Sequence, residues 1–197
     1  MTGQPTRRNV LLSGAAAATG AIVPGELLAQ APLSPTPACD ADTAPTLRQT
    51  EGPFFTPNSP ERQSLLEPGI GGRRLELAGF VLTRSCTPVP RALLDFWQAD
   101  ANGAYDNRGF RLRGHQFSDA NGRYRLETIV PGRYPGRTPH IHVKVQAANR
   151  PVLTTQLYFP EEPGNARDFL FRTELLMRVA KAGDGLQGRF DFVLDMP

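Results

Sequence analysis

The sequence has few of the residues that most often build metal sites. Of its 197 residues, three are histidine (His115, His140 and His142) and two are cysteine (Cys39 and Cys86). A copper–zinc site of the dismutase type needs more imidazoles than that, and neither cysteine lies near a histidine in the chain, so a thiolate metal site is not expected. Basic residues never form a run of five or more, and the formal net charge is only +3, so nucleic-acid binding has no support.

Residues that break regular structure are abundant instead. Glycine and proline number 19 each, and together they make up roughly a fifth of the chain. A chain so rich in turn-forming residues favours short strands joined by tight turns over long helices. Its length fits one domain with enough residues to bury a hydrophobic core.

The first 31 residues have the composition of an export signal. They contain a twin-arginine sequence at 6–11, an apolar, alanine-rich stretch at 10–23, and a small-x-small cleavage pattern at 29–31. The apolar stretch is too short to span a membrane. We therefore expect a Tat signal over 1–31 and a periplasmic or extracellular protein with no membrane contact after cleavage. Its removal takes away two arginines and one glutamate, so 22 basic and 19 acidic residues become 20 and 18, a net charge of +2.

Both cysteines lie in the part of the chain that would be exported. In an oxidising compartment an even pair of cysteines predicts one disulfide, which here joins Cys39 to Cys86. This bond would tie an extended arm rich in proline, alanine and threonine (32–48) to the first strands of the domain that follows it (49–197).

Short apolar runs bounded by turn residues predict seven strands. Asn-Gly turns at 102–103 and 121–122 are typical of hairpins. A helical spacing of apolar residues predicts one late helix over 165–181 that ends at Gly183. The expected fold class is all-β, an antiparallel β-sandwich with one C-terminal helix and an N-terminal extended arm. The expected strands cover 74–83, 92–98, 117–119, 123–130, 140–146, 153–159 and 189–194.

The stretch from Pro131 to His142 holds the most informative residues. It ends in a His-x-His pattern, and the β-branched alternation that follows predicts the start of a strand. Successive side chains of a strand point to opposite faces, so His140 and His142 share one face, about 6.5–7 Å apart along the strand, and can reach one metal ion. Four proline and glycine positions upstream of Arg137 (131, 132, 135 and 136) make this loop tight, and the loop carries Tyr134 and Arg137.

The other donors near this histidine pair narrow the choice of metal. A cupin site needs a glutamate soon after the His-x-His pattern, and residues 143–146 supply none. The facial triad of non-haem Fe(II) needs a carboxylate ligand, and the pattern His-x-Asp/Glu is absent. The anionic oxygen donors at hand are the phenols of Tyr134 and Tyr105, and two phenolates with two neutral imidazoles suit Fe(III). A three-histidine zinc or copper site that uses His115 stays open as an alternative.

Six short motifs occur together between residues 50 and 159. They are TEGPF at 50–54, DFWQADANGAY at 95–105, DxxG at 119–122, TIxPGxYP at 128–135, RxPHIH at 137–142 and TTQLYF at 154–159. With this combination the chain resembles the intradiol ring-cleavage dioxygenases, the family of protocatechuate 3,4-dioxygenase and catechol 1,2-dioxygenase. Within that family it is most similar to the secreted bacterial branch.

The resemblance implies a non-haem Fe(III) centre with four protein ligands. Tyr105 and Tyr134 would be the two tyrosinate ligands, and His140 and His142 the two imidazole ligands. Tyr134 would be the axial tyrosine that leaves the metal when a catechol binds, and it would take a proton from the substrate. The partners implied are a catechol-type small molecule and O2, with a homodimer as one allowed assembly.

Two further residues match functional positions of the family. Arg137 would steady negative charge that develops on the substrate ring, and Gln156 would lie near the same pocket. The implied activity is enzymatic cleavage of a catechol-type aromatic by O2 to a cis,cis-muconate-type dicarboxylate. Trp97 is expected in the core, and His115 matches no ligand of the family.

Two features bear on the choice of function. Larger relatives carry a longer insert between the tyrosine loop and the arginine, whereas only two residues separate Tyr134 from Arg137 here. This predicts a short, open pocket wall and favours extracellular aromatics such as lignin-derived catechols. Without the ligand set, the strand–turn–strand patterns at 89–92 and 119–126 also resemble transthyretin-like sandwiches. A non-catalytic, metal-free binding module of that kind is the alternative function.

Overall fold

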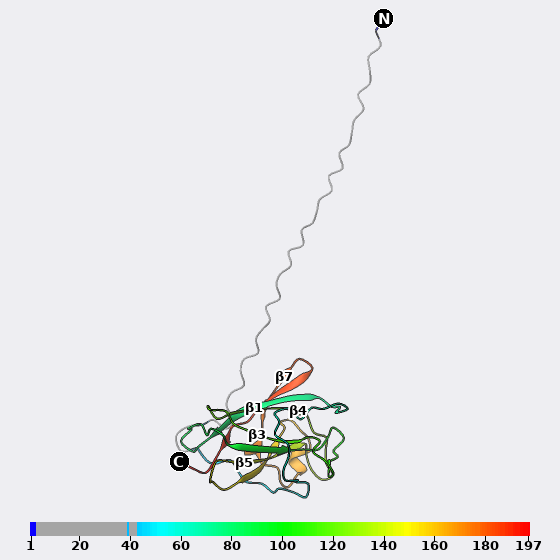
Figure 1. Ribbon diagram of the computed structural model, residues 1–197. Coiled ribbons are helices and arrows are strands. Elements are labelled where there is room, and N and C mark those ends of the chain that lie inside the picture. The colour runs from blue at the N-terminus through cyan, green and yellow to red at the C-terminus, as the bar shows by residue number, and fades with distance from the viewer. Residues whose placement is uncertain (3–38, 40–42) are drawn as a thin grey trace. The chain divides into compact units, whose positions relative to one another are not determined.

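The computed structural model describes residues 1–2, 39 and 43–197. Residues 3–38 and 40–42, which hold the predicted signal and most of the predicted arm, lie outside the described residues. Strands dominate the described part and form two sheets around one hydrophobic core (Figure 1). Its strands are β1 (Arg74–Leu82), β2 (Leu93–Trp97), β3 (Arg113–Phe117), β4 (Arg123–Ile129), β5 (His140–Gln146), β6 (Leu153–Tyr158), β7 (Arg178–Ala182), β8 (Gly185–Arg189) and β9 (Phe192–Val193).

The strand order confirms the predicted β-sandwich, although one of its two sheets contains parallel as well as antiparallel pairs. The first sheet has the order β4-β1-β8-β7, with β9 also paired to β1, and the second has the order β3-β2-β5-β6. All pairs are antiparallel except β1 with β8 and β1 with β9, which are parallel. The first sheet is therefore mixed, with β8 and β9 running parallel to β1.

Strand alternation places the core between the sheets. On β5, Ile141, Val143 and Val145 are fully buried in the core, and they alternate with side chains that point to the opposite face. Trp97 of β2 and Gln156 of β6 lie directly opposite His142 in register, so they share its face. This outward face of the second sheet, called the site face below, carries Asp95, Trp97, His140, His142, Lys144 and Gln156.

An irregular segment, residues 46–62, crosses the site face and is called the covering segment below. It begins along β6, where the Gln49 amide donates to the Thr154 carbonyl at 2.8 Å, and it ends along β3, where the Arg62 amide donates to the His115 carbonyl at 2.8 Å. Because β6 and β3 are the two edges of the second sheet, the segment spans the whole face. Side chains on this face are therefore shielded from solvent although they lie outside the core.

The helix predicted over 165–181 is wrong. The structure has a 3-10 turn at Asn165–Arg167, a second at Thr173–Leu175, and then strand β7. The apolar residues of this stretch do not share one stripe, since Leu175 is fully buried and Phe169 is 78 % exposed. The predicted helix end at Gly183 is instead part of the tight turn between β7 and β8. The predicted strand at 189–194 divides into β8 and β9, and the one predicted at 117–119 lies earlier, as β3.

The predicted disulfide is confirmed. Cys39 and Cys86 are bonded, with their Cα atoms 5.7 Å apart, and Cys86 lies in the turn that follows β1.

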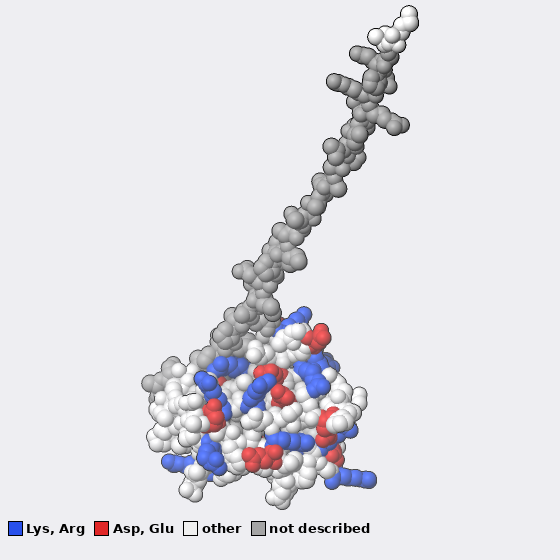
Figure 2. All heavy atoms as spheres, turned by 45° about the horizontal axis from the view of Figure 1, so that its top comes forward, with Lys and Arg blue, Asp and Glu red and all other residues white. Residues whose placement is uncertain are grey.

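On the face of the molecule in Figure 2, acidic and basic side chains are interspersed. No helix in the described ranges is long and apolar enough to cross a membrane.

Candidate metal centre

The two histidines of β5 converge on one point of the site face. Their Nε2 atoms lie 3.1 Å apart, and the side chains of His140 and His142 are both buried. The Nδ1 atom of His140 lies 2.6 Å from the Thr138 carbonyl oxygen, so Nδ1 carries the proton and the Nε2 lone pair is free to bind a metal. The ring of Trp97 stacks on that of His142 at 4.8 Å and an interplanar angle of 8°.

Both imidazoles are held in the neutral form that a metal ligand needs. Burial, with the charge of Arg137 as a further cause, lowers the pKa of His140 to about 4. Burial and the neighbouring His140 lower the pKa of His142 well below its ordinary value. Two buried neutral imidazoles whose Nε2 atoms lie 3.1 Å apart can supply two ligands to one metal ion.

Tyr105 supplies an oxygen donor from a separate turn. Its hydroxyl lies 3.5 Å from Nε2 of His140. The turn before it is held by Asp100, whose Oδ1 accepts hydrogen bonds from the amides of Asn102 and Ala104 at 2.8 and 3.0 Å. Burial raises the pKa of Tyr105 to about 12, so its phenolate form requires a strong positive charge nearby.

Two glycines bring the loops of Tyr105 and Tyr134 together. A Cβ on Gly103 would lie 2.1 Å from the Arg133 carbonyl oxygen, and one on Gly132 would lie 2.4 Å from the Ala101 carbonyl oxygen. The backbones can approach this closely only because both residues lack a side chain. The two tyrosine rings consequently lie with their centroids 6.1 Å apart.

The covering segment contributes a third aromatic ring to this cluster. Phe54 stacks on Tyr105 with the ring centroids 4.4 Å apart, and it meets Tyr134 edge-on with the centroids 5.2 Å apart. The buried guanidinium of Arg113 fixes the Phe54 backbone, since Nη1 donates to the Phe54 carbonyl at 2.6 Å. Its Nε and Nη2 donate to the Asp106 carbonyl, next to Tyr105, at 3.0 and 2.7 Å. Sequence reasoning missed both Phe54 and Arg113, although Phe54 belongs to one of the quoted motifs.

Arg137 and Gln156 belong to one hydrogen-bonded network beside the histidines. Arg137 Nη2 donates to Gln156 Oε1 at 2.6 Å, and Gln156 Nε2 donates to the Thr50 carbonyl of the covering segment at 2.9 Å. Arg137 Nε donates to both carboxylate oxygens of Asp168, at 3.0 and 2.9 Å. Tyr158 completes the network by donating to Gln156 Oε1 at 3.0 Å.

Asp168 is the functional residue that sequence reasoning missed most clearly. Its side chain is 1 % exposed, and besides Arg137 it accepts hydrogen bonds from the amides of Thr138 and Leu170, both at 3.0 Å. Thr138 is the residue whose carbonyl binds His140, so one carboxylate positions both the arginine and the histidine strand. The helix predicted over 165–181 gave no reason to expect Asp168 beside Arg137, because it treated Asp168 as an ordinary polar residue on the helix surface.

The open alternative of a three-histidine site is not supported. His115 lies on β3, and its Nδ1 atom is 2.7 Å from the carbonyl oxygen of Ser59. Throughout the described ranges, no group of three or more His, Cys, Asp and Glu side chains could hold a metal ion. A metal at the histidine pair therefore needs phenol ligands. Trp97, expected in the core, is buried as expected and also packs directly on a histidine of the site.

A family model described as "Dioxygenase" matches residues 50–196. This range includes all four predicted metal ligands, and relatives of the chain are named catechol 1,2-, protocatechuate 3,4- and hydroxyquinol 1,2-dioxygenase. The chain therefore belongs to the intradiol ring-cleavage dioxygenase family. This assignment disfavours the transthyretin-like alternative.

Individual relatives differ in length and in identity. The dioxygenase domain of a dioxygenase carbohydrate-binding protein fusion from Streptomyces sp. SirexAA-E is 58 % identical, with a TM-score of 0.77, and the match covers 78 % of this chain and 100 % of that one. The 3-chlorocatechol 1,2-dioxygenase of Rhodococcus opacus is 28 % identical, with a TM-score of 0.71, over 78 % of this chain and 74 % of that one.

Among curated proteins, the protocatechuate 3,4-dioxygenase beta chain of Burkholderia cepacia is 34 % identical over 62 % of this chain and 65 % of its own length. The catechol 1,2-dioxygenase of Acinetobacter baylyi is 29 % identical over 65 % of this chain and 50 % of its own length. The matched region thus spans half to two thirds of these relatives.

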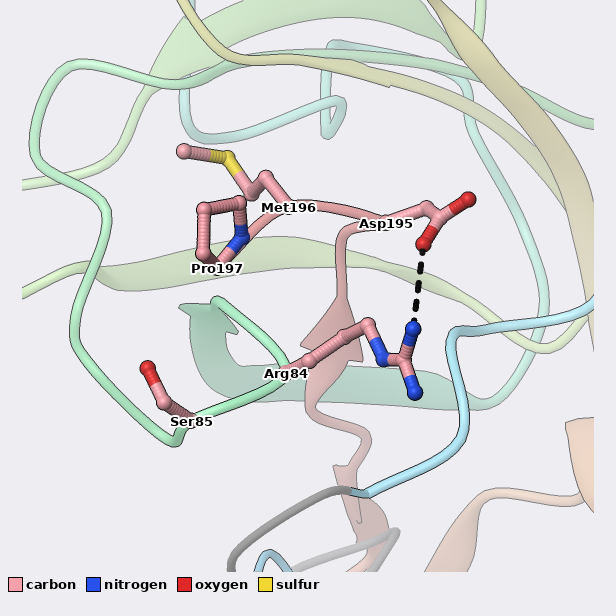
Figure 3. Close-up of a pocket in the computed structure, with 5 residues that line it drawn as sticks. All are labelled: Arg84, Ser85, Asp195, Met196 and Pro197. Carbon is pink, nitrogen blue, oxygen red and sulfur yellow. Dashed lines mark ion pairs between the residues drawn. The ribbon is translucent and has the colours of Figure 1, made fainter.

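A separate hollow lies at the C-terminal end of the chain. It is lined by Arg84, Ser85, Asp195, Met196 and Pro197, and Arg84 pairs with Asp195 at 3.8 Å (Figure 3). None of these residues belongs to the histidine–tyrosine cluster, so this hollow plays no part in the candidate metal centre.

Proposed function

We propose that this chain is an Fe(III)-dependent enzyme that cleaves a catechol-type aromatic with O2 to a cis,cis-muconate-type dicarboxylate. The observation that carries the proposal is the pair of buried Nε2 atoms 3.1 Å apart, with the Tyr105 hydroxyl 3.5 Å from one of them. Tyr134 on the adjoining loop provides the second phenol. Membership of the intradiol family supports the same reaction.

The donor set fits a ferric ion. The two phenols offer hard oxygen donors, the two neutral imidazoles offer nitrogen donors, and the set includes no thiolate. Phenolate oxygen prefers a trivalent cation. Burial raises the pKa of Tyr105 to about 12, so the phenolate forms only beside a strong cation, as Fe(III) would be. When bound, the ferric ion supplies Lewis-acid chemistry that makes the catecholate ring reactive toward O2.

The residues of the chain then divide the remaining work. Tyr134 is half-buried and lies on a loop, and by the family resemblance it would be the phenol that makes room for a substrate and takes its hydroxyl proton. Arg137 holds a fixed positive charge beside the histidines, where negative charge builds up on the ring. Gln156 is bonded at both ends of its amide and acts by positioning Arg137.

We propose a location outside the cytoplasm on separate grounds. The twin-arginine sequence at 6–11 and the cleavage pattern at 29–31 support Tat export. The disulfide between Cys39 and Cys86 fits an oxidising compartment. Tat carries folded proteins, so the metal would be acquired before export.

Oxygen uptake with catechol tests the activity. The iron-loaded protein should consume one O2 per catechol and yield a product with two carboxylates, identified by mass spectrometry. A product that keeps one hydroxyl and gains one aldehyde, from cleavage beside rather than between the hydroxyls, would contradict the proposal. So would the absence of oxygen uptake from protein that holds iron and binds catechol.

A further inference from the structure

An open groove adjoins the proposed active site. It has a volume of about 460 Å³, and two site residues, Tyr134 and Arg137, form part of its wall. The rest of the lining comes from the same loop and from the 3-10 turn after β6: Arg133, Pro135, Gly136, Gly164 and Arg167. A substituent on a bound catechol ring can therefore leave the metal centre along this groove.

The floor of the groove is bare backbone. A Cβ on Gly136 would meet no atom within 4 Å, so space is open above this residue. Only two residues separate Tyr134 from Arg137, so the loop between them is too short to fill the groove. The groove thus has room for a chain of several atoms in addition to the ring.

The charge on the groove wall has one sign. Three of its seven lining residues are arginines, and none is acidic. Arg137 is committed to Asp168 and Gln156, and Arg133 pairs with Glu162 at 3.4 Å. The exposed guanidinium of Arg167 makes no ion pair or side-chain hydrogen bond with any residue in the described part of the chain. Arg167 therefore leaves an uncompensated positive charge facing a space that adjoins the catalytic residues.

We propose that this groove binds a carboxylate carried on a short chain attached to the catechol ring, and that Arg167 is the residue that selects it. The proposal rests on the proposed function and names its substrate class. Arg137 binds Asp168 through Nε and Gln156 through Nη2, and the proposed function assigns its charge to the ring itself. A carboxylate two or three bonds further out can reach Arg167, and a guanidinium binds a carboxylate through two parallel hydrogen bonds.

Equilibrium binding under anaerobic conditions tests the proposal without turnover. The probes are 3-(3,4-dihydroxyphenyl)propionate and its uncharged amide, titrated calorimetrically into the iron-loaded protein. The acid should bind about tenfold more tightly than the amide, which is the strength of one charge-assisted contact in a half-exposed site. Raising the salt concentration should reduce this ratio, because the groove is open to solvent.

Variants assign the preference to one residue. Arg167→Ala should bring the acid-to-amide ratio close to one, and Arg167→Glu should reverse it. Arg150→Ala is the matched control, since Arg150 is also exposed and has no ion pair within the described residues, but lines a different cavity. This control should keep the wild-type ratio.

The outcomes separate the two proposals. Wild-type protein that cleaves catechol but binds acid and amide equally well would overturn the groove assignment and leave the proposed function standing. A preference that survives Arg167→Glu would overturn it too. Iron-loaded protein that neither binds nor cleaves any catechol would overturn both proposals.

Discussion

The outer faces of the two sheets follow the same strand alternation and have opposite fates. On the site face, the outward residues His140 and His142 of β5 are buried and meet at 3.1 Å. On the outer face of the first sheet, the outward residue Arg125 of β4 stays about half exposed and pairs with Glu76 and Glu127 at 3.1 and 3.0 Å. The strand pattern alone does not distinguish a metal centre from an ordinary solvated surface.

The difference lies in what covers each face. The covering segment spans the second sheet from one edge to the other, and the loops of Tyr105 and Tyr134 close over one end of it. Burial holds the imidazoles neutral and raises the pKa of Tyr105. The segments that cover this face therefore determine the protonation states of the candidate ligands. The first sheet has no such cover within the described residues, and its charged side chains remain hydrated.

The largest effect is expected from removing a ligand on the covered face. His142→Ala should lose its iron and its oxygen uptake, because one of only two imidazoles is gone. His115→Ala is the matched control: it removes a histidine of the same sheet that binds the Ser59 carbonyl, and it should keep both iron and activity. Metal analysis and oxygen uptake measure the two variants side by side. Equal iron loss in both would contradict the ligand assignment.

A smaller effect is expected from removing charge beside the ligands. Arg137→Leu should keep iron but cleave catechol about 10²–10³-fold more slowly, the usual result of losing a preorganised donor. Asp168→Asn should act in the same direction more weakly, since Arg137 loses its ion-pair partner but stays bonded to Gln156. Steady-state kinetics measure kcat and KM for each. A wild-type kcat in Arg137→Leu would show that the arginine has no part in the reaction.

The closure of the tyrosine loops can be tested through stability. Gly103→Ala should lower the free energy of unfolding by about 3 kcal/mol, from the cost of a positive φ plus a steric clash with the Arg133 carbonyl. Gly136→Ala has a similar positive φ but meets no atom within 4 Å, so it should cost only about 1 kcal/mol. Denaturant unfolding measures both values. Equal losses would mean that close approach of the loops is unimportant.

The smallest effect is expected on the uncovered face. Arg125→Ala breaks two half-exposed ion pairs and should change the free energy of unfolding by less than about 1 kcal/mol, with iron content and turnover unchanged. The same unfolding and metal assays apply. A loss of iron in this variant would mean that the two faces are not independent.

The sequence predicted the elements that follow a strict local pattern. The His-x-His repeat identifies the shared face of His140 and His142 because a strand has a period of two residues. Alternation likewise predicted the major strands, and cysteine pairing predicted the disulfide. These features depend on neighbours in the chain, so they can be read without knowing the fold.

The parts of the site that depend on distant contacts could not be predicted in the same way. The covering segment has no periodicity, and its path is set by hydrogen bonds to both edges of the second sheet. Asp168 lies 31 residues from Arg137 in the sequence, within a stretch whose apolar spacing imitates a helix. Gly103 and Gly132 matter because two loops meet, which no local pattern reveals.

Visible absorption of the purified, iron-replete protein, measured together with its metal content, tests the central claim most directly. Two phenols and two imidazoles on a ferric ion predict about one iron per chain and a red-brown charge-transfer band. That band should change in both Tyr105→Phe and Tyr134→Phe, which remove only the phenol oxygen. Colourless protein that holds zinc instead of iron, or a band that neither substitution alters, would contradict the account.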